Sequence, residues 1–283
     1  MKHYLSTKSA SAESGICNGR NTAYRYFTTA RSGATNTTNM SVIKTILLFT
    51  MLFTGFEGSS QKTVDPLTFH RLVGLGKKSE VAILLKQGVD PNCLINEGVT
   101  PAMTAAMNNQ AEMIELLYQS KADLNLQTPA GWTAVLYASE HGSNEALAAL
   151  IRSGTDINLR LQGGESAVLQ ACFKSHPETA KILINAGQTL GQPTAIGLTE
   201  LIVASDMGQL EVVKLLLQKK DNINAFNKFG ETALIRASLR GHTRVVALLL
   251  SQGADKKITD GTGRTAQGWA RTKGFEEIEK MLD

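Results

Sequence analysis

A spacing of 33 residues dominates this sequence of 283 residues. Glycine recurs at that interval without a slip, at Gly98, Gly131, Gly164, Gly197, Gly230 and Gly263. Two positions after each glycine stands a threonine or serine, and seven positions after it stands an alanine, from Ala105 to Ala270. An unbroken period of this length indicates one supersecondary unit, repeated and stacked in single file. Such a chain works by presenting a long exterior surface.

Each repeat is predicted to contain two helices and a turn. The threonine or serine, for example Thr232, is expected to cap a first helix by accepting hydrogen bonds from backbone N–H groups. The alanine is expected in the middle of that helix, where only a small side chain lets two helices approach closely. Asp-x-Asn pairs such as Asp123 and Asn125 open a turn through local side-chain hydrogen bonds. The second helix carries an apolar stripe that fits burial on most sides, as in Val245, Val246, Leu248, Leu249 and Leu250.

Three segments carry a resemblance to a known family: Gly98-Val-Thr-Pro-Ala-Met-Thr-Ala105, Gly131-Trp-Thr-Ala-Val-Leu-Tyr-Ala138 and Gly230-Glu-Thr-Ala-Leu-Ile-Arg-Ala237. Together with the period, they resemble the ankyrin repeat and its TPLHxA-type signature. The resemblance covers residues 65–283 and implies an all-α ankyrin-repeat solenoid, in which helix–loop–helix units are joined by β-turn fingers. We expect an ankyrin-repeat domain over residues 61–283, with units that start near residues 65, 98, 131, 164, 197, 230 and 263, the last of them shortened.

The sequence departs from the family pattern in two respects. The histidine that the family places five residues after the glycine is kept only at His70, and the later units have Met103, Leu136, Leu169, Ile202, Ile235 and Gly268. In the fourth unit, Thr189-Leu-Gly191 replaces the Asp-x-Asn turn. We therefore expect an irregular turn between the fourth and fifth units.

The first sixty residues do not follow the repeat. Residues 1–39 are rich in Ser, Thr, Asn and Gly without an apolar period, and we expect them to be disordered. Residues 40–60 combine Lys44, an apolar run and small residues before Gln61, which is a secretory signal pattern. Because such signals begin a chain, translation is expected to start at Met40, with residues 1–39 an over-extended reading frame. Two alternatives stay open: a transit peptide in residues 1–39 and an uncleaved membrane anchor in the apolar run.

Charge and composition exclude several classes of protein. The formal charge of +4 comes from residues 1–60, which hold six basic and two acidic residues, whereas residues 61–283 hold 23 of each sign. A nucleic-acid-binding protein needs a surplus of Lys and Arg to displace counterions, so no nucleic-acid partner is expected. The hydrophobic share of 42% argues against disorder throughout, and three cysteines in this length argue against a disulfide scaffold.

Residues with catalytic or metal-binding chemistry are sparse. His141, His176 and His242 fall in loops between helices, and two imidazoles without a third ligand make a poor zinc site. Cys93 and Cys172 lie more than two units apart, beyond the reach of a disulfide, and are expected to be free thiols. We therefore predict no catalytic residues, no metal site and no cofactor.

The resemblance also implies where a partner binds. Stacks of this kind use their turns and the exposed ends of the first helices as a concave surface. Apolar and arginine side chains there are typical of protein interfaces, although some of the rings are alternatively expected to fold inward and join neighbouring units. Basic residues toward the C-terminal half, such as Lys228 and Arg264, favour a partner with some acidic surface. By register, the predicted partner-binding residues are Trp132, Phe173, Lys174, Ile196, Leu198, Met207, Phe226, Phe229, Leu239 and Arg240.

Together these features predict a non-enzymatic protein-binding module. Its expected state is an exported monomer, secreted or periplasmic, with no stable membrane insertion after the signal is cleaved. It is expected to hold a protein partner on its concave face. The alternative is an intracellular or membrane-tethered ankyrin scaffold, with residues 1–60 as a tether or an organelle address.

Overall fold

The computed structural model describes residues 64–283, which fall within one structural unit, Lys62–Asp283. The predicted disordered segment 1–39, the signal-like segment 40–60 and the cut before Gln61 lie outside the described residues. Fourteen helices occupy residues 64–283, and the extended pairing in that range is limited to two isolated bridges, Ile95–Val99 and Phe226–Thr232. The predicted all-α class is therefore confirmed.

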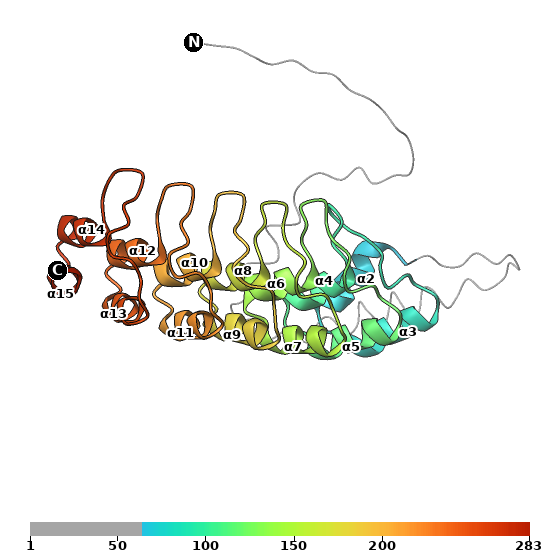
Figure 1. The fold of residues 1–283 in the computed structure, drawn as a ribbon. Helices are drawn as coiled ribbons and strands as arrows, with labels where there is room; N and C mark the ends of the chain where they lie inside the picture. Colours follow the sequence, from blue (N-terminus) through green and yellow to red (C-terminus); the bar gives the residue numbers. More distant parts are fainter. Residues whose placement is uncertain (1–63) are drawn as a thin grey trace, which may run out of the picture. The chain divides into compact units, whose positions relative to one another are not determined.

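The helices form two rows, and long loops project from the row of first helices (Figure 1). The first helices are α2 (Pro66–Gly74), α4 (Pro101–Met107), α6 (Ala134–His141), α8 (Ala167–Phe173), α10 (Glu200–Asp206), α12 (Ala233–Arg240) and α14 (Ala266–Lys273). The second helices are α3 (Lys78–Lys86), α5 (Ala111–Gln119), α7 (Asn144–Arg152), α9 (Pro177–Asn185), α11 (Leu210–Gln218), α13 (Thr243–Ser251) and α15 (Glu276–Leu282). Each first helix packs on the next first helix and on its own second helix, so the units stack in single file.

The repeated threonine or serine caps its helix in every unit where the sequence predicts it. Thr133 Oγ1, for example, accepts a hydrogen bond of 3.1 Å from the N–H of Leu136, and the same bond recurs at Thr100, Ser166, Thr199, Thr232 and Thr265. Such a bond satisfies a backbone donor that the helix itself leaves free. The repeated alanines, from Ala105 to Ala270, are fully buried between neighbouring first helices, as their small size predicts.

The loops that join one unit to the next are tied together at their base by asparagines. Asn92 Oδ1 accepts from the N–H of Asp123 at 2.8 Å, and Asn125 Oδ1 accepts from the N–H of Asp156 at 2.8 Å. Asn158 and Asn224 make the same bond to the following unit. These bonds fix the rise from unit to unit, because each asparagine spans one junction.

The junction between the fourth and fifth units is irregular, as predicted. Gly191 stands at the position of Asn92, Asn125, Asn158 and Asn224, so this junction lacks the asparagine bond. The N–H of Gly191 instead donates to Glu200 Oε2 at 3.1 Å, and Arg160 donates to the carbonyls of Thr189 and Gln192. The tip of this loop nevertheless keeps its usual geometry, because the N–H of Gly197 donates to the carbonyl of Thr194 as its counterparts do.

Candidate functional site

Three neighbouring loops of the C-terminal half carry much of the predicted binding surface. We call them the Ile196 finger (residues 191–199), the Phe229 finger (residues 224–232) and the Thr262 finger (residues 257–265). Backbone hydrogen bonds join them in order: the N–H of Lys228 donates to the carbonyl of Ile196 at 3.0 Å, and that of Gly261 donates to the carbonyl of Phe229 at 2.7 Å. The three fingers therefore form one continuous surface.

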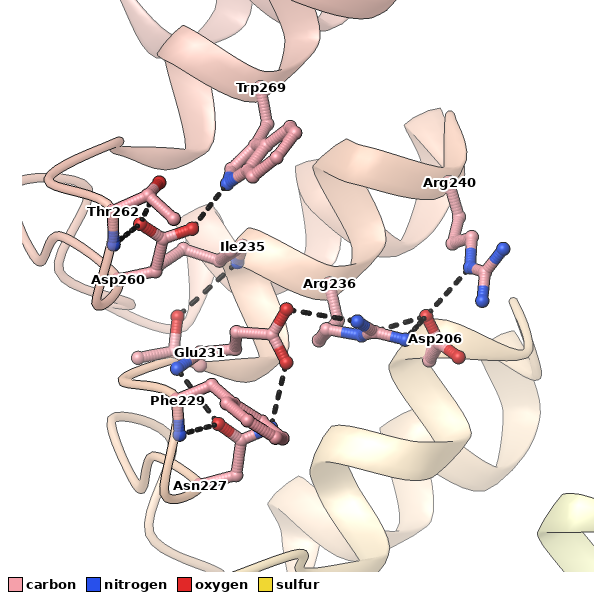
Figure 2. Close-up of polar contacts among 11 residues, drawn as sticks. Asp206, Asn227, Phe229, Glu231, Ile235, Arg236, Arg240, Asp260, Thr262 and Trp269 are labelled. Carbon is pink, nitrogen blue, oxygen red and sulfur yellow. Dashed lines mark hydrogen bonds and ion pairs between the residues drawn. The ribbon is translucent and has the colours of Figure 1, made fainter. Parts of the chain in front are cut away.

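A polar side chain three residues before the repeated glycine closes each of these fingers. Thr194 Oγ1 accepts from the N–H of Leu198 at 3.1 Å. Asn227 Oδ1 accepts from the backbone N–H groups of Phe229 and Glu231 (Figure 2). Asp260 Oδ1 accepts from those of Thr262 and Arg264 in the next finger. Burial acts to raise the pKa of Asp260, but hydrogen bonds from Thr262 and from the indole of Trp269 hold that pKa at about 2. The carboxylate therefore stays charged and rigidly held.

A second set of contacts fixes the corner between the fingers and the first helices. In three units, the residue after the repeated glycine meets the side chain five positions further on. The ring of Trp132 stacks on Tyr137 with centroids 4.7 Å apart, and the guanidinium of Arg264 lies 4.8 Å from the ring centre of Trp269. Glu231 Oε1 binds Arg236 Nη1 at 3.0 Å (Figure 2). These contacts, which we call corner pairs, hold the loops of Trp132, Glu231 and Arg264 against their own first helices.

The ends of the first helices are linked by ion pairs. Asp206 Oδ1, at the end of α10, accepts from Arg236 Nε at 3.0 Å and from Arg240 Nε at 2.9 Å (Figure 2). Burial acts to raise the pKa of Asp206, but the hydrogen bonds from Arg240 and Arg236 lower it below its ordinary value. Lys174 and Glu140 form the equivalent pair at 2.9 Å between α8 and α6. The charges on this part of the surface thus largely compensate one another.

The predicted partner-binding residues divide into three groups. Five apolar side chains are exposed: Phe173 at 37%, Ile196 at 38%, Met207 at 37%, Phe226 at 66% and Phe229 at 56%. Lys174 and Arg240 are exposed and ion-paired. The remaining three, Trp132, Leu198 and Leu239, are half-buried.

The exposure expected of Trp132 and Leu198 is therefore corrected. Both side chains pack against the hydrophobic core, and Trp132 also stacks on Tyr137. Trp132 thus follows the alternative expectation, in which the ring folds inward. In three units the residue directly after the repeated glycine contacts its own first helix, whereas Ile196 and Phe229, directly before that glycine, are exposed.

Sequence reasoning missed the helix side of the corner pairs. Tyr137, Arg236 and Trp269 all stand six residues after their repeated glycine. The same 33-residue register that located the finger residues places these three opposite them. The 33-residue period could have identified these helix residues, but only together with the expectation that a finger contacts its own first helix.

The buried histidine of the first unit makes two contacts that hold neighbouring segments together. Burial lowers the pKa of His70, whose Nε2 contacts the carbonyl of Cys93 at 2.8 Å and whose Nδ1 contacts Thr104 Oγ1 at 2.9 Å. Cys93 and Cys172 are free thiols, as predicted. Within residues 64–283, no three His, Cys, Asp or Glu side chains gather as a metal site would require, and none of the helices is long and apolar enough to cross a membrane.

The fold and surface define a helical repeat protein whose units present loops and helix ends on one side. The model of the family "Ankyrin repeats (3 copies)" matches residues 69–161, 140–227 and 201–282. The chain therefore belongs to the ankyrin repeat family, and the resemblance drawn from the sequence is confirmed. Ankyrin repeats generally act as protein–protein interaction modules and are typically non-enzymatic.

Solved structures show the same architecture. The ankyrin repeat domain of Bcl-3, described as a unique member of the IkappaB protein family, is 28% identical with a TM-score of 0.67, and the match covers 77% of this chain and 98% of that one. The human ASB11 ankyrin repeat domain is 23% identical with a TM-score of 0.67, covering 76% of this chain and 97% of that one, and shows the fold alone. A comparison with curated proteins gave no match.

Proposed function

We propose that this chain binds a protein partner on the side formed by its fingers and the ends of its first helices. The observation that carries the proposal is the exposure of large apolar side chains in the fingers and at the ends of α8 and α10. Exposed apolar clusters of this kind on a soluble domain favour a protein interface. The residues are Phe173, Ile196, Met207, Phe226 and Phe229.

The surface is well suited to binding without rearrangement. The fingers are closed by internal hydrogen bonds, and the Phe229 and Thr262 fingers also contact their first helices through corner pairs, as Figure 2 shows for Glu231 and Arg236. A surface that is already ordered loses little conformational freedom on binding. Aromatic side chains held in this way are the usual energetic centres of interfaces.

The test compares two triple variants of equal size. F173A/M207A/F229A removes apolar side chains from the proposed binding side, and I83A/Y118A/M281A removes exposed ones from the second helices α3, α5 and α15. The first variant is expected to weaken capture of the partner from a cell extract by about tenfold or more, with unchanged helical circular dichroism. Loss of the partner only in the second variant would place the binding surface on the other side.

The proposal includes export before binding. The support is the sequence pattern of residues 40–60, with Lys44, the apolar run and small residues before Gln61. N-terminal sequencing of the mature protein is expected to start at Gln61. A mature protein that keeps residues 40–60 would instead favour a membrane-tethered scaffold.

A further inference from the structure

The fingers carry a group of exposed side chains that combines aromatic rings with positive charge. We call Ile196, Phe226, Lys228, Phe229 and Arg264 the finger patch. Phe226 and Phe229 are each more than half exposed, and Lys228 stands between them in the sequence. Two phenylalanine side chains left in water add nothing to the stability of a folded domain. Exposed apolar side chains that are grouped in this way favour a binding site.

Phe229 is held in place on both flanks. Its own N–H donates to Asn227 Oδ1 at 2.9 Å, and its carbonyl accepts from Gly261 in the next finger (Figure 2). On the other flank, Lys228 donates to the carbonyl of Ile196. The backbone that presents the ring is therefore tied to both neighbouring fingers.

The two cations of the finger patch form no ion pair. In residues 64–283, no carboxylate lies within ion-pair distance of Lys228 or Arg264. Lys228 Nζ lies 5.0 Å from the ring centre of Phe229, and Arg264 lies over Trp269. Of the nearby carboxylates, Glu231 is paired with Arg236, and Asp260 keeps its charge but is buried in its finger, where it accepts from Trp269. The exposed charges of the finger patch are therefore both positive and lie beside its aromatic rings, although the repeat domain as a whole is neutral.

We infer that the finger patch docks an acidic segment of the partner that carries an apolar anchor residue. This inference rests on the proposed function and specifies the chemistry of the partner. The anchor covers Phe226, Phe229 and Ile196, and carboxylates on either side of it pair with Lys228 and Arg264. Single-stranded nucleic acid fits less well, because it requires a row of cations along its backbone, and the finger patch offers two.

The direct test uses synthetic peptides and the full chain. A short fluorescein-labelled peptide of repeated Glu-Glu-Phe is compared with Lys-Lys-Phe and Glu-Glu-Ser versions and with oligodeoxythymidine, by fluorescence anisotropy. The Glu-Glu-Phe peptide is expected to bind about tenfold more tightly than either altered peptide, and its affinity is expected to fall as salt rises. Equal binding of the Lys-Lys-Phe peptide, or no binding up to about 1 mM, would overturn the inference.

Matched charge reversals locate the binding. K228E/R264E alters the finger patch, and K86E/K219E makes the same change of charge at exposed ends of the second helices α3 and α11. The first variant is expected to weaken Glu-Glu-Phe binding about tenfold, and the second to leave it unchanged. Tighter binding of oligodeoxythymidine, or self-association by sedimentation that K228E/R264E abolishes, would assign the finger patch to nucleic acid or to a second copy.

The same variants separate this inference from the proposed function. Suppose the natural partner is lost by F173A/M207A/F229A but is held equally by K228E/R264E and K86E/K219E. The partner then binds the proposed side without using the charges of the finger patch, so only the inference fails. If all of these variants retained the partner, that result would contradict both the inference and the proposed function.

Discussion

The hydroxyl of Ser166, which caps α8, donates a hydrogen bond of 2.7 Å to Glu200 Oε1 at the start of α10 in the next unit. Glu200 is fully buried, and Arg160 Nη2 lies 3.9 Å from the same oxygen. The units that begin at the other repeated glycines have proline or alanine at this position. Glu200 thus introduces a buried charge at the junction where Thr189-Leu-Gly191 replaces the Asp-x-Asn turn, and its second oxygen accepts from the N–H of Gly191.

Replacing this carboxylate is expected to destabilise the protein. Glu200→Ala removes the acceptor for Ser166 and Gly191 and leaves Arg160 without its ion-pair partner, which should lower the free energy of unfolding by roughly 2–4 kcal/mol. Urea denaturation followed by circular dichroism measures the change. The control Glu211→Ala removes an exposed carboxylate paired with Lys214 on α11 and should cost under about 0.5 kcal/mol. Equal or greater stability of Glu200→Ala would show that the alanine of the other units suits this junction as well.

The neighbouring Asp221 predicts a pH dependence of stability. Burial, followed by the negative charge of Glu200, raises the pKa of Asp221 to about 6 from an ordinary 3.8. Between these two values the folded protein keeps a proton that the unfolded chain has released. The free energy of unfolding should therefore fall as pH rises from 4 to 6, by roughly 1–3 kcal/mol.

Asp221→Asn isolates this effect, because an amide retains the acceptor for the N–H of Asn222 without the charge. The variant should match the wild type near pH 4 and be the more stable protein above pH 6. Asp255→Asn, which changes an exposed turn carboxylate, serves as the control. A constant stability difference between wild type and Asp221→Asn over this range would contradict the assignment.

The regular part of the fold follows from the sequence because it rests on local chemistry repeated at one period. A threonine such as Thr133 caps its own helix, and an alanine such as Ala138 fits only between helices, so each residue identifies its own place. The compensation by Glu200 could not be foreseen in the same way. It depends on Arg160 and Gly191 both contacting Glu200 across a unit boundary, and neither the period nor any local pattern predicts these contacts.

The residues of the candidate site were likewise predictable only in part. Phe226 and Phe229 were predicted as exposed from their register alone, because a finger tip leaves few neighbours to cover them. Trp132 shares the finger setting but stacks on Tyr137, since a large flat ring gains contact area by folding onto an adjacent ring. Burial of a finger residue therefore depends on its partner on the helix, which register alone does not reveal.

This difference predicts opposite effects for two aromatic substitutions. Trp132→Ala removes a half-buried ring together with its stacking on Tyr137, and should lower the free energy of unfolding by about 2–3 kcal/mol. Phe229→Ala removes an exposed ring and should change stability by under about 0.5 kcal/mol, while weakening partner capture. Thermal unfolding and a capture assay on both variants check this. A stable Trp132→Ala variant that loses the partner would return Trp132 to the binding surface.

Two glycines with similar backbone geometry allow the cost of backbone strain to be measured apart from the cost of a steric clash. Gly142 and Gly253 both have positive φ, 67° and 86°. A Cβ on Gly253 would meet nothing within 4 Å, whereas one on Gly142 would lie 2.6 Å from Nδ1 of His176. Gly253→Ala should therefore cost about 1 kcal/mol from the left-handed backbone alone, and Gly142→Ala roughly 2–4 kcal/mol.

The excess cost at Gly142 is expected to disappear when the imidazole is removed. In a H176A background, G142A should cost no more than G253A, since only the backbone term remains. Urea denaturation of the wild type, H176A, G142A and the double variant provides the cycle. Additive single effects would mean that the ring moves aside freely, and that its contact with the carbonyl of Glu140 contributes little.

The two described thiols should differ in reactivity. Burial, then the charge of Asp90, raises the pKa of Cys93 to about 11, so at pH 8 its thiolate fraction is roughly a hundredfold below that of an ordinary thiol. Cys172 is fully buried in α8, and burial together with the charge of Glu200 raises its pKa further. Iodoacetamide should therefore label Cys93 slowly in the folded protein and Cys172 only after unfolding in urea, as read by mass spectrometry of the separated peptides. Labelling of Cys172 at the rate of Cys93 in native buffer would show that α8 opens locally, and the buried contact between Ser166 and Glu200 would then be weaker than its geometry indicates.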